Sequence, residues 1–184
     1  DGNVYVAAHG LYNPYYPTTA FGNPYLQNGA LGLAGSTEHG ASATIYRIDR
    51  ITGVPTVFVR LPQQADPNLP WNPLAGPGIG NLAYDESHDQ FFATNLDDGT
   101  IYQIDNLGLT GVIVDSFDPD EAAAGLALDN GLPGMPTFGD NLWGIGVANN
   151  AVYYSVWRQG TTTDPILIRK VDLDGSGNLI KPSD

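Results

Sequence analysis

Short runs of alternating apolar and polar residues recur along this chain, each ended by glycine, asparagine or aspartate. Three of them resemble one another: IYRID at 45–49, IYQID at 101–105 and IRKVD at 168–172. Strict alternation over four to eight residues is the pattern of a half-buried β-strand. Similar units recurring roughly every fifty residues are typical of repeat architectures, among them β-propellers. The pattern therefore predicts an all-β chain built of β-propeller blades.

The middle repeat is the clearest. Its predicted strands are 80–85, 90–95, 100–105 and 112–117, separated by a polar turn at 86–89, an Asp-Asp-Gly turn at 97–99 and a glycine-bounded turn at 108–111. Aspartate followed by glycine between two alternating runs is a strong hairpin signal. Four antiparallel strands joined by short turns make one blade.

The other two repeats follow the same order. The third has strands at 142–147, 151–157, 166–172 and 178–181, and the first has strands at 3–8, 45–49 and 54–61 without an opening strand. We therefore predict one domain over 1–184, with about three four-stranded antiparallel blades at 1–62, 78–118 and 141–181, the first incomplete. Because closed propellers have four to eight blades, we expect this chain to be part of a larger or assembled propeller.

The long connections, at 9–42, 62–78 and 118–141, are predicted to share one face of the blades, because connections in an antiparallel meander alternate between two ends. Long loops without secondary structure of their own are usually functional, so the loop-rich face is the predicted working surface. Its aromatic residues can act as rigid contacts with proteins or sugars, or pack down to hold the loops in place. They are Tyr12, Tyr15, Tyr16, Tyr25 and Trp71.

The net charge of the chain makes some classes of partner unfavourable. The formal net charge is −13, from 20 acidic and 7 basic residues, which disfavours nucleic acid and anionic membranes. The sequence holds no run of roughly twenty apolar residues that would insert into a membrane. It also has no cysteine, which excludes disulfides and thiol chemistry and fits a secreted bacterial protein. We expect an extracellular or cell-surface location.

One local motif is a candidate binding site for a cofactor, Ca²⁺. The sequence DLDGSGNL at 172–179 places oxygen-bearing side chains at alternate positions, with glycine at the sixth and an apolar residue at the eighth, as in the first part of an EF-hand loop. The candidate ligands are Asp172, Asp174, Ser176 and Asn178. The same residues are also typical of a hairpin turn. Ser183 stands at the position where an EF-hand has its bidentate glutamate. Both interpretations stay open.

Threonine clusters on the loop-rich face are candidates for O-linked sugars on composition alone. They are Thr18, Thr19, Thr161, Thr162 and Thr163.

Three segments carry a family resemblance: GNLAYD at 80–85, NLDDGTIY at 95–102, and the pair LWGIGV and VYYSVW within 142–157. They resemble NHL and SMP-30-type β-propeller repeats, in particular those of large bacterial secreted or cell-surface proteins. An SMP-30-like lactonase would imply a divalent metal at the ring centre, held by Glu, Asn and Asp from inner strands. Here the inner strands offer Asn81 and Asp85.

Our leading hypothesis for function is a non-enzymatic extracellular β-propeller module for binding or structural self-assembly into an oligomer or fibre. It would act through its loop-rich face and its open strand edges. Further copies of the chain, other extracellular proteins and glycans are the expected partners. The alternatives are a fragment of a metal-dependent SMP-30-like lactonase or lyase, and a glycan-binding module.

Overall fold

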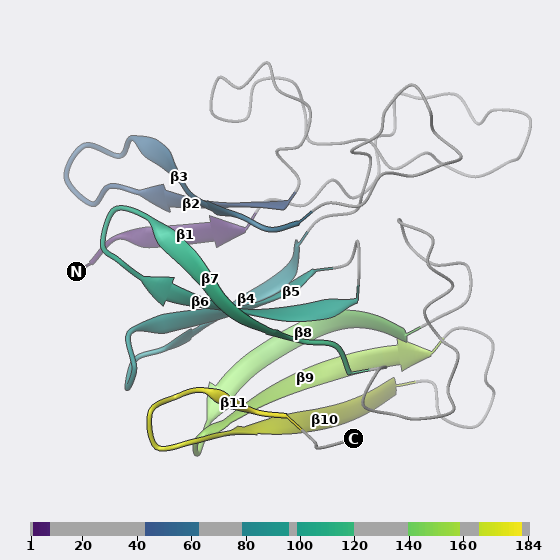
Figure 1. The fold of residues 1–184 in the computed structure, drawn as a ribbon. Helices are drawn as coiled ribbons and strands as arrows, with labels where there is room; N and C mark the ends of the chain where they lie inside the picture. The colour runs from purple at the N-terminus through teal and green to yellow at the C-terminus, as the bar shows by residue number, and fades with distance from the viewer. Residues whose placement is uncertain are drawn as a thin grey trace, which may run out of the picture.

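The computed structural model describes residues 2–7, 43–62, 79–95, 99–119, 140–158 and 166–181 (Figure 1). These residues form eleven β-strands and no α-helix, so none of their segments is a helix long and apolar enough to cross a membrane. The predicted all-β class is confirmed for this part of the chain.

The strands form three antiparallel sheets, and within each sheet the spatial order follows the chain. We call them the first, second and third blades. The first contains β1 (Val4–Ala7), β2 (Thr44–Ile48) and β3 (Pro55–Arg60); the second contains β4 (Ile79–Asp85), β5 (Gln90–Asn95), β6 (Thr100–Asn106) and β7 (Gly111–Phe117); the third contains β8 (Asp140–Ala148), β9 (Ala151–Arg158), β10 (Ile166–Leu173) and β11 (Leu179–Ile180). The two four-stranded meanders match the predicted strands closely, and the arrangement is that of propeller-like blades.

The turns before the last strand share two features in all three blades, although they differ in length. An Asp or Asn oxygen at the start of the turn accepts a hydrogen bond from a backbone N–H inside it, from Thr52 at 2.8 Å, Gly108 at 3.0 Å and Ser176 at 2.8 Å. Each turn also contains a glycine with positive φ. The pairs are Asp49 with Gly53, Asn106 with Gly108, and Asp174 with Gly177.

The strand register supports the alignment of the repeats by their closing aspartates, Asp49, Asp105 and Asp172. The residues that precede them, Ile48, Ile104 and Val171, pair with Val4, Phe91 and Val152 near the start of the second strand of each blade. Asp49 follows its strand, whereas Asp105 and Asp172 lie within β6 and β10.

The blades stack face to face in three layers (Figure 1), with one hydrophobic core on each side of the second blade. The core towards the first blade includes Phe58 and Phe91, whose ring centroids are 5.5 Å apart. The core towards the third blade includes Phe92 and Leu142. Because successive side chains of β5 point to opposite faces and both faces are covered, every residue of β5 is buried.

Equivalent strands of neighbouring blades lie against one another. The innermost strands β4 and β8 are in contact, as are the outer strands β3 and β7, and β7 and β11. By this correspondence β3 is a fourth strand, β2 a third and β1 a second. The predicted incompleteness of the first blade is thus confirmed for the described residues, in which β1 pairs with β2 alone.

The two ends of the strands differ in their connections. The turns after the first and third strands of the blades lie at one end, on the left of Figure 1. The strand ends that flank the long connections lie at the other end, as do the ends of β5 and β6 that their short connection joins. The antiparallel pairing requires this, since Ala7 is opposite Ile45 and Ile79 is opposite Asn95.

Candidate functional site

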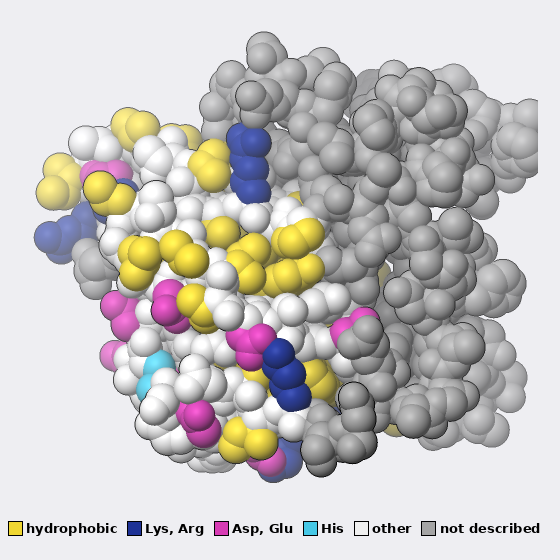
Figure 2. Space-filling view, in the orientation of Figure 1, with side chains coloured by type: hydrophobic (Ala, Val, Ile, Leu, Met, Phe, Trp, Pro, Cys, Tyr) yellow, Lys and Arg dark blue, Asp and Glu magenta, His cyan; other side chains and the backbone are white. Residues whose placement is uncertain are grey.

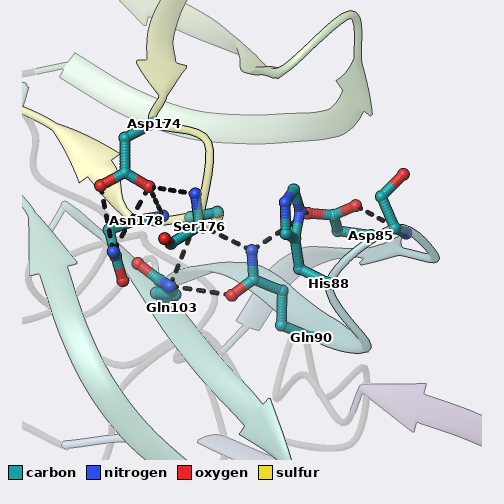
Figure 3. Close-up of polar contacts among 9 residues, drawn as sticks. Asp85, His88, Gln90, Gln103, Asp174, Ser176 and Asn178 are labelled. Carbon is teal, nitrogen blue, oxygen red and sulfur yellow. Dashed lines mark hydrogen bonds and ion pairs between the residues drawn. The ribbon is translucent and has the colours of Figure 1, made fainter.

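Two places in the described residues bring polar or accessible side chains together: a buried polar contact between the second and third blades, and a groove beside β1. The first is centred on the β10–β11 turn. There the carbonyl oxygen of Gly177 accepts a hydrogen bond from Nε2 of Gln90 at 2.9 Å and from Nε2 of Gln103 at 3.2 Å (Figure 3). The turn of the third blade is therefore held directly by two side chains of the second.

The same two glutamines continue the network into the second blade. Gln103 Nε2 donates to Gln90 Oε1 at 2.8 Å, and Gln90 Nε2 donates to Asp85 Oδ2 at 3.0 Å. His88 Nδ1 lies 2.7 Å from the same carboxylate oxygen. Gln103 Oε1 is buried and accepts no hydrogen bond. We call the set Asp85, His88, Gln90, Gln103 and Gly177 the inter-blade clasp.

The Asp85 carboxyl group is buried within the clasp but stays easily ionised. Burial raises its pKa, whereas hydrogen bonds from Gln90, His88 and the backbone N–H of Ser87 lower it, and the resulting pKa lies below the usual value. A buried carboxylate is tolerated when its oxygens are satisfied in this way. The chemistry of the clasp is therefore structural: its donors and its charge serve contacts inside the molecule.

The inner-strand residues implied by the SMP-30 resemblance lie on one face of β4. Asn81 is exposed, and its Oδ1 accepts a hydrogen bond from the backbone N–H of Leu82 at 2.8 Å. Asp85 belongs to the clasp. Across the parts of the chain that the structure describes, no three His, Asp or Glu side chains are grouped so that they could hold a metal.

The four residues of the predicted calcium loop lie at the end of β10 and in the turn that follows. Asp172 is on the exposed face of β10 and is paired with Lys170. The carboxylate of Asp174 accepts hydrogen bonds from the backbone of Ser176 and from the backbone and side chain of Asn178, which lower its pKa. These contacts of Asp174 fit the hairpin interpretation, and calcium binding at this loop stays a prediction.

The remaining predicted site residues lie outside the described residues. They are the aromatic contacts Tyr12, Tyr15, Tyr16, Tyr25 and Trp71, and the threonines Thr18, Thr19, Thr161, Thr162 and Thr163.

The groove beside β1 has a volume of about 480 Å³. Residues 2–5 form one wall, and Leu82 and Tyr84 of β4, with Phe91 and Asn106, form the other. It lies where a first blade would have its innermost strand, which is not among the described strands, because β1 is a second strand and β4 is the innermost strand of the next blade.

Tyr84 is held firmly in the wall of this groove. Its ring packs on Phe91 with centroids 4.8 Å apart, and its hydroxyl donates to Asp89 Oδ1 at 2.7 Å. Asn106 Nδ2 donates to the same oxygen at 2.7 Å. The hydrogen bond to Asp89 raises the pKa of Tyr84 to about 12. The ring is nonetheless 48% exposed, so a rigid aromatic surface faces the groove.

Neither the clasp nor the groove was predicted from the sequence. A signal for the clasp existed, since Gln103 stands between Tyr102 and Ile104, and Gln90 precedes Phe91 and Phe92. The groove had no signal of its own beyond the absence of an opening strand in the first repeat.

Comparison with protein-family models finds no match for this chain, and comparison with curated proteins finds none at a significant level. The resemblance to NHL and SMP-30 repeats therefore stays a prediction, and the case for function depends on the geometry above.

Proposed function

We propose that this chain is a non-enzymatic β-propeller module that acts by binding and by structural self-assembly. The observation that carries the proposal is that exposed apolar side chains lie on both outward faces of the blade stack, on the third blade beside the ion pair of Lys170 and Asp172. Inside the stack the equivalent faces are covered by a neighbouring blade. Burial of exposed apolar surface stabilises an assembly of copies.

On the first blade the outward face carries Val4, Val6 and Val57, which are 55%, 43% and 40% exposed. The register places Val6 and Val57 on the two sides of Tyr46, so the three valines share one face. The opposite face, with Tyr5 and Ala7, packs on the second blade. The first blade is thus apolar on both sides, as the fully covered second blade is.

On the third blade the outward face carries Tyr153, Ile168 and Ile180, with Ile168 78% exposed. These residues alternate with those that pack on the second blade, such as Val152 and Leu179. An outward first-blade face on one copy and an outward third-blade face on another form a head-to-tail contact. Contacts of this kind close into rings or continue into filaments.

Open strand edges add a second route to association. Figure 2 shows hydrophobic side chains gathered in a band across the middle of the molecule, over β7. Val112 and Val114 of β7 are 44% and 47% exposed. Edge strands with exposed apolar residues readily pair with other chains.

Sedimentation velocity at rising protein concentration tests self-assembly. The net charge of −13 repels like copies, so we expect association to increase with salt as this repulsion is screened. Ile168→Lys is expected to weaken association. The matched control is Ile51→Lys, at the tip of the β2–β3 turn, where the side chain is 82% exposed. A wild-type chain that stays monomeric at about 1 mM and high salt would refute self-assembly.

We further propose an extracellular or cell-surface setting, in which other extracellular proteins and glycans are partners. The acidic composition and the lack of cysteine support this setting. Recovery of the protein in the culture medium or on the surface of its source cells would test it. Exclusive recovery from the cell interior would contradict it.

A further inference from the structure

We propose that two copies of this chain close head to tail into one six-bladed ring, in which the third blade of each copy packs on the first blade of the other. The inference rests on the proposed self-assembly and assigns it a partner, a contact and a number of copies.

The first observation is a repeated isoleucine on the side of each blade that faces the next. Ile45, Ile101 and Ile168 begin the three recurring runs and pair with the second strand of their blades in the same register. Ile45 packs in the core towards the second blade and Ile101 in the core towards the third, and both are 0% exposed. Ile168 lies on the outward face of the third blade and is 78% exposed. A further blade on this face would bury Ile168 as the following blades bury the other two.

An aromatic residue in the second strand of each blade repeats this pattern. Tyr5, Phe92 and Tyr153 are equivalent, because each is opposite the third residue of its recurring run. Tyr5 packs against the core towards the second blade, and Phe92 is buried in the core towards the third. Tyr153 is exposed on the outward face. The third blade therefore has the same apolar side chains that a following blade covers in the other two.

The first blade has the complementary face. Val4 is equivalent to Phe91 and Val152, because each pairs with the fourth residue of its recurring run. Phe91 and Val152 face the preceding blade and are 3% and 0% exposed, whereas Val4 faces outward and is 55% exposed. Tyr5 packs on Phe91 with ring centroids 4.5 Å apart. The same contact between copies joins Tyr153 of one copy to Val4 of the other, so a second copy covers each outward face with the kind of face that covers it inside the stack.

The polar side chains on the third-blade face fit the same junction. Lys170 is equivalent to Gln103, since both are the third residue of their runs. Gln103 lies in the inter-blade clasp and donates a hydrogen bond to Gly177 in the β10–β11 turn of the next blade. Lys170 is also a hydrogen-bond donor, and it forms an exposed ion pair with Asp172. By the same geometry the Lys170 ammonium group faces the β2–β3 turn of the other copy.

The number of copies follows from the shape of the stack. The innermost strands β4 and β8 make extensive contact, whereas the outer strands of neighbouring blades make little. The blades therefore spread apart towards their outer strands, and repetition of this arrangement curves the stack around its inner side. Closed propellers have four to eight blades. Each copy contributes three blades, so two copies give six, within this range, and three copies give nine, outside it.

Cross-linking of introduced cysteines tests the contact, because the chain has no cysteine of its own. Tyr153→Cys and Val4→Cys are prepared as separate variants of the whole chain, mixed in equal amounts and treated with a short bismaleimide. We expect a covalent pair from the mixture and none from either variant alone. The matched control is Ile51→Cys, at an 82% exposed turn position, which should give no covalent pair when it is mixed with Tyr153→Cys. Circular dichroism checks that each variant is folded.

A chain that carries both Tyr153→Cys and Val4→Cys tests closure of the ring. A closed pair is cross-linked at both junctions and gives no product larger than two copies, whereas an open filament gives a ladder of larger products. Sedimentation velocity of the wild type should show a species of two copies. Ile168→Lys should weaken this pair at least about tenfold, as loss of a central contact does.

Three results would overturn the ring. They are a covalent pair from either single variant alone, which indicates like faces in contact, a ladder from the doubly substituted chain, and no covalent pair from the mixture.

The experiments separate this inference from the proposed function. If the wild type self-associates but the mixture is not cross-linked, the ring inference fails and self-assembly stands. Weakening of that association by Val114→Lys and not by Ile168→Lys would then assign it to the edge of β7. If the wild type stays monomeric at about 1 mM and high salt, self-assembly itself fails, and the ring fails with it.

Discussion

Replacing Gly177 with alanine should destabilise the protein far more than an ordinary turn substitution. Gly177 is buried at the centre of the inter-blade clasp and has φ of 84°. A methyl group there would lie 2.6 Å from Cγ of His88 and 2.8 Å from Nε2 of Gln90. The substitution therefore combines backbone strain with a steric conflict between two blades.

The magnitude follows from these two contributions. Placing alanine at positive φ costs about 1 kcal/mol. Crowding in a packed interior costs about 1–3 kcal/mol. If Gln90 moves away, its hydrogen bonds to Gly177 and Asp85 are lost, at about 1 kcal/mol each. Since movement of Gln90 relieves the crowding, the two costs are alternatives, and we expect the free energy of unfolding to fall by about 2–4 kcal/mol, a large part of the stability of a typical domain.

Denaturant unfolding of three variants separates the contributions. Gly108→Ala has φ of 86° and no atom within 4 Å of the added methyl, so it reports backbone strain alone. Gly175→Ala, in the same turn as Gly177, meets no atom within 4 Å and has no positive φ. The expected order of cost is Gly177, then Gly108, then Gly175. A cost for Gly177→Ala within about 0.5 kcal/mol of that for Gly108→Ala would refute the clasp as a tight contact.

Three other predictions follow from the packing and the turns. Gly111→Ala should lower the free energy of unfolding by about 1–3 kcal/mol, because the methyl would lie 2.5 Å from Cε1 of Phe58. Part of this loss should be recovered in the double variant with Phe58→Leu, and strictly additive costs would contradict a steric conflict with Phe58. Asp85→Asn should reduce stability by about 1–3 kcal/mol near neutral pH. Since the pKa of Asp85 is lowered in the folded state, the wild-type advantage is complete above the ordinary pKa of an aspartate, 3.8, and is lost as pH falls through the lowered pKa. An advantage that persists at the lowest pH would argue against the Asp85 carboxylate as its cause. Asn150→Gly should raise the free energy of unfolding by about 0.5 kcal/mol, because Asn149 and Asn150 have φ of 51° and 54° and a two-residue turn of this kind favours Asn-Gly. Thermal unfolding measures the change, and a lower midpoint than that of the wild type would contradict the prediction.

The features that could be predicted from the sequence are those encoded by neighbouring residues. Strand β5 was predicted with its exact bounds, since Gln90–Asn95 lies between a polar turn and an Asp-Gly signal. The Asn149-Asn150 turn was predicted for the same reason. Alternation and turn chemistry act over a few residues, so a single sequence is sufficient to read them.

The features that could not be predicted depend on residues far apart in the chain. Gln103 of the second blade donates a hydrogen bond to Gly177 of the third, and no local sequence pattern indicates that these two residues are in contact. The groove exists because Tyr84 and Val4 line the same space, which follows from how the first two blades stack. Contacts of this kind are set by side-chain packing between sheets, and no spacing in the sequence reports them.

The neighbour-to-neighbour order of strands within each blade also has a consequence for how the molecule comes apart. The backbone hydrogen bonds of each blade join only consecutive strands, and the main contacts between blades among the described strands join adjacent blades. Stability in such a stack is close to a sum of blade terms and of terms between neighbours. Strand β1 is held most weakly by this measure, since residues 8–43 separate it from β2, the longest separation in sequence between paired strands among those described. We expect β1 to be the first strand to fray, which means that the groove opens and closes on a faster timescale than the rest of the molecule unfolds.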